Sequence, residues 1–506
     1  MPSFNALPDR TAGVLVSMLV LGLSAGLMPW AWLFGGIAMA LPLVHPVLGL
    51  ALLVLSVTAQ DSVRLAGGLS LTQAAIPLAL AGWGARMLMQ PPQQLARQRS
   101  VAAWGLFLTA LLWATALSPY AASEGMKELW RWGAACLAWI IAATTVRKPW
   151  HYAILIAALL GAPLLNALLG LGQFALGDGP QAFRIAAESP YVRAYGTIGQ
   201  PNSFAGYMNL AWPLALALAI CWSWQSVAII RRHWGERRGI ARAHKSAKLG
   251  MAVYASRIMP PLTASLLWVI TGILLAALAA SFSRGAWLGA LAGLLGMLLA
   301  VAARIGWRIF ENAWLVTSLC LICGALVLLA IGDARVVPSA ILVRMESITS
   351  SLRLFDPGTV AITSQNFAVV ERMAQLWAGW QMFLAHPLSG VGPGSYNLAY
   401  PAVASSPWFA SRGHAHNYYL HIAAEAGILG LTTYILLLGM VLGDLWRGLQ
   451  RSRSIIRRGV LIGTCGMIAA MAGHNLFENL HVLHLSIHSA AAWGMAAAIA
   501  QTTEEN

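Results

Sequence analysis

The stretch GHAHNYYLH, residues 413–421, contains His414, His416 and His421 within eight positions. Asn417 lies between the second and third histidines, and a long apolar run follows directly. Three imidazoles this close together suit a metal site, a site that moves protons near neutral pH, or simple packing at a helix entrance. The choice depends on where the stretch lies relative to a membrane.

The composition indicates a protein that spans a membrane many times. Of 506 residues, 58% are hydrophobic and only 10% are charged, and apolar runs near 20 residues recur along the chain. Only helices or closed barrels satisfy backbone groups in lipid, so we predict one all-α, polytopic transmembrane domain over residues 1–506. The first apolar run follows Arg10 as a signal peptide would, but so many spans follow that we interpret it as an uncleaved helix.

Hydropathy predicts about 12–14 transmembrane helices. Their expected ranges are 12–30, 31–43, 47–57, 71–89, 101–118, 127–146, 150–175, 203–223, 261–281, 285–303, 313–332, 418–443, 459–478 and 482–500. The division between 31–43 and 47–57 rests on His45-Pro46, because proline breaks a helix.

Basic loops predict the orientation, since Lys and Arg accumulate on the cytoplasmic side. Residues 224–260 carry eight Lys and Arg against Glu236 alone. The basic segments near 97–99, 147–148 and 447–458 fall on the same side when the spans are counted, and both termini do so too. The net charge of +15 is then explained by topology and by attraction to anionic membrane lipids, so we expect no nucleic-acid partner.

The opposite, external face holds the segments that can do chemistry. They are 176–202, the short turn 282–284, and 333–417, a loop long enough to be functional. Arg193 begins RAYGTIGQPNSFAGY, where its plain interpretation is a headgroup contact at a helix entrance. Arg284, in SFSRGAWLG, lies between two apolar spans, where a guanidinium is costly unless it lines a polar cavity or meets an anion.

The long external loop contains a predicted amphipathic helix within residues 369–396. Met373, Trp377, Trp380 and other apolar residues recur there at helical spacing, so this helix is expected to lie on the membrane or to cap the spans. The glycine-rich run 390–394 lacks the strand-to-helix context of a nucleotide loop. We interpret it as a tight connection.

Four motifs in this order resemble the O-antigen ligase and polymerase superfamily. They are Arg-x-x-Gly-Thr-x-x-x-Pro-Asn (193–202), Ser-x-Ser-Arg-Gly (281–285), His-Pro-Leu-x-Gly-Val-Gly-Pro-Gly (386–394) and His-x-His-Asn-x-Tyr-Leu (414–420). The resemblance covers roughly residues 190–440. It implies a membrane glycosyltransferase of C-type fold that needs no metal or other cofactor. Such an enzyme transfers a glycan from undecaprenyl diphosphate to a hydroxyl of a lipid, glycan or protein acceptor, at the outer face of the cytoplasmic (inner) membrane.

The resemblance and the chemistry together suggest roles for individual residues. The leaving diphosphate needs cations, and we expect Arg193 and Arg284 to supply them, because arginine stays charged and bonds phosphate bidentately. The acceptor hydroxyl needs a base, for which we choose His416 and place His414 second. Asn417 is expected to cap the following helix. The predicted substrate-binding residues are Arg372, His414, Asn417 and Asn202.

Plainer interpretations of the histidines stay open at this stage. His421 and Glu425 are four apart and predict a local polar pair. A metal nest of His414, His416 and His421 has no fixed zinc spacing and no obvious carboxylate in the loop, so we expect no metal site. Further along, His474 and Glu478 are four apart, and the sequence suggests that His481, His484 and His488 share one helical face looking into the cavity.

A transporter of a small anion or lipid-linked solute is the alternative from another functional class. Arginines and histidines in many spans would suit an anion pathway. However, the sequence shows no paired half-sequences, and the candidate residues gather on one face instead of at mid-depth.

Overall fold

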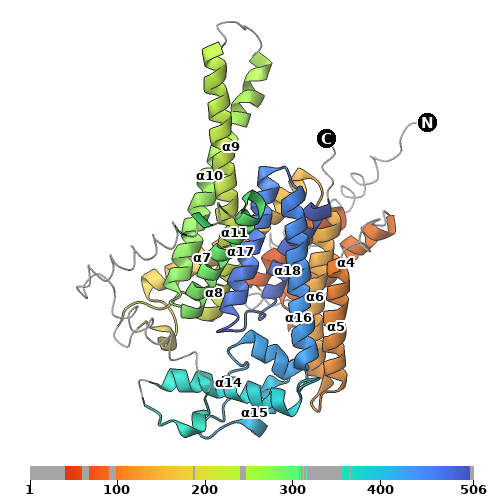
Figure 1. Ribbon diagram of the computed structural model, residues 1–506, viewed down its shortest axis with the longest axis vertical. Helices are drawn as coiled ribbons and strands as arrows, with labels where there is room; N and C mark the ends of the chain where they lie inside the picture. The colour runs from red at the N-terminus through yellow and green to blue at the C-terminus, as the bar shows by residue number, and fades with distance from the viewer. Residues whose placement is uncertain are drawn as a thin grey trace, which may run out of the picture.

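The computed structural model describes residues 40–59, 68–89, 99–185, 189–239, 247–306, 355–363 and 366–501, together with residues 308, 311, 312 and 315. Within these ranges the regular structure is helical, which confirms the predicted all-α class. Long helices stand side by side in an upright bundle, while two shorter helices lie across one end (Figure 1).

The described helices have the following bounds: α3 Pro46–Ser56, α4 Leu71–Met89, α5 Arg99–Ala116, α6 Ala122–Thr145, α7 Pro149–Leu176, α8 Pro201–Asn209, α9 Trp212–Gly239, α10 Ala247–Ala280, α11 Arg284–Ile305, α14 Phe367–Ala385, α15 Tyr396–Val403, α16 Tyr418–Arg451, α17 Ile455–His474 and α18 Leu485–Gln501. Seven apolar segments among them are long enough to cross a membrane, with α8 and the first part of α9 forming one. The protein is therefore a polytopic membrane protein. The predicted spans 12–30 and 313–332 lie outside the described residues, apart from Leu315.

The predicted break at His45-Pro46 is confirmed. Residues 40–44 are helical, His45 has extended backbone, and α3 begins at Pro46. The His45 side chain accepts a hydrogen bond from the backbone N–H of Val47, so it caps the helix that the proline starts.

Two predicted spans need correction where the chain turns between α17 and α18. Span 459–478 extends past the real helix end at His474, and span 482–500 starts before α18 does at Leu485. Leu483 and His484 have φ values of 51° and 57°, which an α-helix does not allow. The prediction that His481, His484 and His488 share one helical face is therefore wrong.

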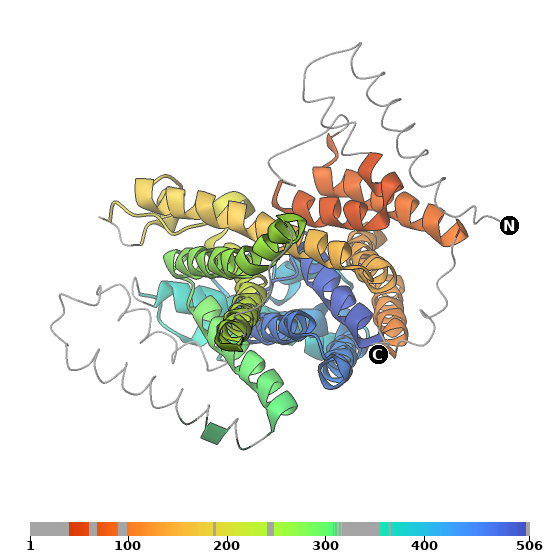
Figure 2. The ribbon, with the colours of Figure 1, turned by 90° about the horizontal axis from the view of Figure 1, so that it is seen from above.

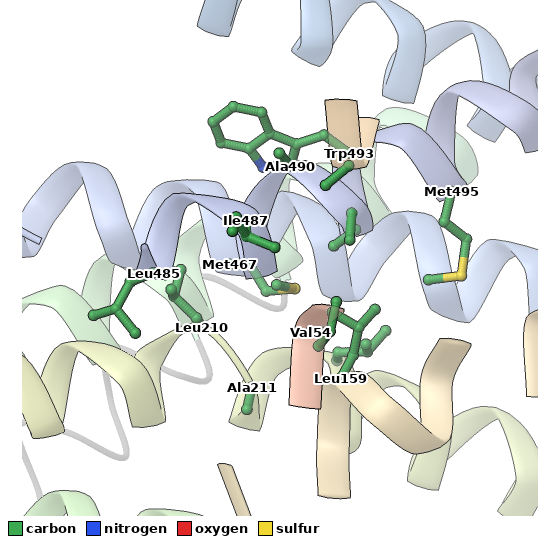
Figure 3. Close-up of a cluster of buried hydrophobic side chains, with 14 of the residues drawn as sticks. Val54, Leu159, Leu210, Ala211, Met467, Leu485, Ile487, Ala490, Trp493 and Met495 are labelled. Carbon is green, nitrogen blue, oxygen red and sulfur yellow. The ribbon is translucent and has the colours of Figure 1, made fainter. Parts of the chain in front are cut away.

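The C-terminal helix α18 is the packing centre of the bundle. Nearly all of its side chains are buried, and seen from above it lies among the other helices (Figure 2). Ile487, Ala490 and Trp493 of α18 lie in the same buried cluster as Val54 of α3 and Leu159 of α7 (Figure 3). Lipid is as apolar as these side chains, so association of the helices depends on close packing. Gly494 provides it, because a Cβ there would lie 2.4 Å from the Trp139 carbonyl oxygen of α6.

The basic connections lie together at one end of the bundle. Arg147, between α6 and α7, donates a hydrogen bond to Gln501 at the end of α18, at 3.3 Å. The C-terminal end of α9, the N-terminal end of α10 and the α16–α17 connection lie at this same end, whereas α14 and α15 lie at the opposite end (Figure 1). The described parts of the basic connections and of the long loop thus occupy opposite ends of the bundle, as the sequence predicted.

The predicted amphipathic helix is α14, and α14 with α15 covers the end of the bundle near the start of α16. The buried face of α14 differs from the expected stripe. It uses mainly small residues and Gln375 together with Met373 and Met382, whereas Trp377 and Trp380 are only partly buried.

Candidate active site

Glu478 is the centre of a polar cluster at the end of the bundle that α14 covers. It lies in the turn after α17, and only 4% of its surface is exposed. Its Oε1 lies 3.2 Å from both His414 Nε2 and His416 Nδ1. Its Oε2 accepts a hydrogen bond from Asn202 Nδ2 at 2.7 Å and lies 3.8 Å from Arg372 Nη2. One buried carboxylate therefore joins four side chains from three distant parts of the sequence.

The two histidines reach Glu478 from the loop that enters α16. Asn417 has extended backbone, and its side chain accepts a hydrogen bond from Leu420 N at 3.0 Å, which confirms it as the helix cap. His416 directly precedes the cap with φ 52°, a conformation that costs a non-glycine residue roughly 1–3 kcal/mol. Such strain persists only where surrounding contacts fix it, here the contact with Glu478.

The hydrogen-bond pattern determines which nitrogen of each ring carries hydrogen. His414 Nδ1 accepts a bond from the backbone N–H of His416 at 3.1 Å, so in the neutral ring the hydrogen is on Nε2 and faces Glu478. An ionised carboxylate can only accept, so His416 Nδ1 also carries a hydrogen. The Nε2 of neutral His416 is then a lone-pair acceptor, whereas both nitrogens of His414 are engaged.

Electrostatics favours an ionised Glu478 beside a neutral His414. Burial alone would raise the pKa of Glu478, but the adjacent His416, then His414 and Arg372, hold its pKa well below the usual range. Burial lowers the pKa of His414 to about 3, although Glu478 opposes this shift. The cluster therefore holds a carboxylate that can stabilise positive charge arising next to it.

Asn202 connects this carboxylate to Arg193. Asn202 Oδ1 accepts from Arg193 Nη2 at 2.9 Å while its amide nitrogen donates to Glu478. The Arg193 Nε donates to the Ser281 carbonyl at 2.7 Å, which fixes the plane of the guanidinium. The chain RAYGTIGQPN brings both residues to the cluster, because Pro201 starts α8 and Asn202 is the second residue of that helix.

Arg284 is the first residue of α11, at the same corner of the bundle. Ser281, which binds Arg193, lies three residues earlier, and a Cβ added at Gly285 would lie 3.0 Å from His474 Cδ2 and from Phe477 Cβ. The N-terminus of α11 therefore abuts the turn that carries Glu478. Arg284 is half-buried, and it lies at the junction between the apolar helices α10 and α11, as the sequence predicted.

A second buried glutamate organises the glycine-rich run. The backbone N–H groups of Gly394 and Tyr396 donate to the Glu425 carboxylate at 2.9 and 3.0 Å, while Gly392 N donates to the Glu425 carbonyl at 2.9 Å. Helix α16 is interrupted at Gly427, with φ 65°, where a Cβ would lie 2.1 Å from the Leu388 carbonyl oxygen. The run is thus the tight connection that the sequence predicted, and it anchors α14 and α15 to α16.

The structure brings together most of the predicted site residues. His414, His416, Arg372 and Asn202 meet at Glu478, and Arg193 joins through Asn202. The predicted local pair of His421 and Glu425 is confirmed at 3.5 Å. Glu478 itself was missed as the centre, because the sequence only suggested a pairing with His474. Its signal was a lone carboxylate in GHNLFENLHVLH, within a chain that has just 17 acidic residues.

His414, His416 and Glu478 also have the composition of a metal site, with one ligand atom of each within 4.8 Å of the others. The sequence prediction of no metal site considered carboxylates within the loop alone, whereas Glu478 lies outside it. The hydrogen on His414 Nε2, however, occupies the nitrogen that would have to coordinate the ion. The hydrogen-bonded cluster therefore fits these ring positions better than a metal does.

Residues 269–435 match the family model for O-antigen ligase, which confirms the resemblance to the O-antigen ligase and polymerase superfamily. No curated protein matches the chain. The matched segment contains Arg284, Arg372, His414 and His416, whereas Arg193 and Asn202 precede it and Glu478 follows it.

Proposed function

We propose, from the match of residues 269–435 to the O-antigen ligase family and from the geometry of the Glu478 cluster, that this protein is a metal-independent membrane glycosyltransferase. It moves a glycan from undecaprenyl diphosphate to an acceptor hydroxyl at the outer face of the cytoplasmic membrane. The observation that carries this proposal is the continuous set of contacts from His416 through Glu478 and Asn202 to Arg193. It links the group suited to deprotonate an acceptor with a cation suited to the leaving diphosphate.

His416 acts as the general base through Nε2. The acceptor oxygen attacks the anomeric carbon, its proton passes to His416 Nε2, and the bond to the diphosphate breaks with the electron pair on the leaving oxygen. Glu478, bonded to Nδ1, orients the ring and stabilises the imidazolium that forms, as a carboxylate does in other catalytic histidine pairs.

His414 is the weaker choice for the base. Its Nδ1 accepts the backbone N–H of His416, and its Nε2–H faces Glu478. With both nitrogens engaged, His414 positions the carboxylate and the His416 backbone. The assignment of His416 as base and His414 as support rests on this difference.

Arg193 and Arg284 stabilise the diphosphate as it departs with increasing charge. Two contacts already fix the Arg193 guanidinium, and such preorganised cations lower the barrier without reorganisation during the reaction. Arg284 adds its charge from the N-terminus of α11, where the helix dipole also favours an anion. Arg372, beside Glu478 and half-buried on α14, is suited to contact the glycan or its phosphate.

The test is a reaction with purified protein in detergent. Supplied with a glycan linked to undecaprenyl diphosphate and an acceptor, the protein should consume the donor and release undecaprenyl diphosphate, measured by mass spectrometry of the lipid fraction. An anion transporter would leave the carrier lipid intact, and that result would reject the proposal.

The acceptor class can be assigned by profiling glycans and lipids of a deletion strain. Loss of long chains with intact single units would identify a polymerase. Long chains stranded on the carrier lipid would identify a ligase.

A further inference from the structure

A large groove lies at the basic end of the bundle, opposite the Glu478 cluster. Its volume is about 1000 Å³, at the upper limit of typical ligand pockets. Residues of α7, α9, α10 and α17 line it, together with Arg453 and Ser454 from the α16–α17 connection.

The groove changes character along its length. Its lining residues on α7 run from Pro149 to Ile156, and those near α17 run from Arg453 to Val460. Seven helical residues span about 10 Å, so the arginine end and the apolar end are separated by roughly that distance. Leu218 of α9 and Leu267 of α10 complete the apolar part.

Positive charge is concentrated at the arginine end of the groove, opposite its apolar end. Arg453 and Arg457 both line the groove, and the Arg457 guanidinium lies 5.9 Å from the centre of the Tyr152 ring, which also lines it. Helices α7 and α17 both begin here, so two helix N-termini add partial positive charge. Among the described residues that line the groove, none is acidic.

We propose that this groove binds an anionic phospholipid of the leaflet that faces the basic end. The phosphate lies against Arg453, Arg457 and the two helix N-termini, and an acyl chain fills the apolar part. Basic pockets between membrane helices suit such headgroups, because each nearby cation attracts an anionic lipid and the apolar walls replace its hydrocarbon surroundings. A zwitterionic lipid offers the same chains without the net negative charge and should bind more weakly.

Native mass spectrometry of the delipidated full chain tests the proposal with two probes of equal acyl composition, phosphatidylglycerol and phosphatidylethanolamine. Phosphatidylglycerol should bind at least tenfold more tightly. The double variant Arg453→Gln/Arg457→Gln should lose about 10–30-fold of that affinity, the expected effect of two interfacial cations. Arg451→Gln is the matched control, because Arg451 is exposed at the same end but does not line the groove.

A second variant tests the apolar part without changing charge. Leu267→Trp should obstruct the acyl chain and weaken binding, whereas Leu262→Trp, at a 57% exposed position of α10, should not. Equal binding of the two lipids, equal losses in Arg451→Gln, or unchanged binding in Leu267→Trp would each overturn the proposal. Displacement of the lipid by millimolar inorganic phosphate would reassign the site to free phosphate. If the double variant does not fold, Leu267→Trp and the lipid comparison still decide.

Discussion

Two buried glutamates at the same end of the bundle differ in the main partners of their carboxylates. Glu425 is 7% exposed, and two backbone N–H groups of the glycine-rich run donate to its carboxylate. Glu478 is 4% exposed, and its carboxylate faces imidazoles, an amide and a guanidinium. The Glu425 carboxylate thus mainly holds the glycine-rich loop, whereas the Glu478 carboxylate mainly contacts side chains.

The partners of each carboxylate distinguish a structural glutamate from one suited to catalysis, which residue type and burial do not. Both glutamates lie beside histidines, and burial is similar. Backbone amides cannot change protonation, so a carboxylate bound to them only fixes geometry. A carboxylate bound to a histidine can stabilise charge that appears on that ring during a reaction. The comparison predicts loss of activity around Glu478 and loss of stability around Glu425.

The largest expected effect is that of His416→Ala. Transfer should fall by about 10²–10⁴-fold, the usual contribution of a general base, while the protein folds and binds donor as before. The measurement is single-turnover transfer, with donor binding followed separately. His414→Ala should cost less, because that ring supports Glu478 instead of receiving the proton. If His414→Ala were inactive and His416→Ala active, His414 would be the general base and His416 the supporting residue.

The next largest loss of activity is expected for substitutions of Arg193 and Arg284. Arg193→Lys and Arg284→Lys should recover only part of the activity that alanine variants lose, because lysine restores the charge but not the planar, bidentate geometry. Initial rates with donor below saturation measure this. Wild-type rates for Arg284→Lys would show that no bidentate contact with the diphosphate exists there. At Arg193 the loss should also include the contact with Asn202.

The two glutamates themselves give the direct contrast. Glu425→Gln removes charge-assisted bonds to two backbone amides, so the free energy of unfolding should fall by about 1–3 kcal/mol, with transfer per folded molecule largely kept. Glu478→Gln is the matched variant. It should lower the rate of the chemical step more than Glu425→Gln does and should lower the melting temperature less. Thermal melts in detergent and transfer rates measured on the same preparations check both. The same pattern of loss in both variants would remove the distinction.

The sequence predicted many of the helices and named several residues of the candidate site. Hydropathy located α4, α7 and α11 to within a few residues, and the proline at position 46 predicted where α3 begins. The order of four motifs identified Arg193, Arg284 and His416 as candidates. These features are local, because each depends on composition or spacing within a short window.

The sequence was insufficient where the outcome depends on how a helix ends. Apolar periodicity continues beyond His474, but the chain leaves the helix at Asn475, whose carbonyl accepts from Tyr418 N at 2.8 Å and whose side chain accepts from Leu480 N at 3.1 Å. The first contact joins segments about sixty residues apart, the second shapes the turn after the helix, and together they direct Glu478 toward the histidines. No local pattern encodes such a pairing, so the centre of the cluster emerged only from the fold.

A smaller effect concerns pH. The pKa of folded His414 is lowered to about 3, against about 6.5 in an unfolded chain. Below pH 6.5 the unfolded chain therefore binds a proton at His414 that the folded chain does not bind. The free energy of unfolding then decreases by up to about 1.4 kcal/mol for each unit by which the pH is lowered. Between pH 7 and 5, wild type should lose more unfolding free energy than His414→Gln. His386→Gln, at an exposed residue after α14, is the control and should follow wild type.

The smallest expected effect is that of a chelator, which should leave transfer unchanged. The two imidazoles and Glu478 have the composition of a zinc site, so the expectation rests on the ring nitrogens. His414 Nδ1 accepts the backbone N–H of His416, which leaves the ring hydrogen on Nε2, the atom that faces Glu478. A nitrogen that carries hydrogen has no lone pair for a metal, and a bound cation would also oppose the positive charge that His416 acquires as base. Initial rates after dialysis against excess chelator measure this, with an added zinc arm. Loss of transfer that zinc restores would turn the cluster into a metal centre and transfer the role of base to another group.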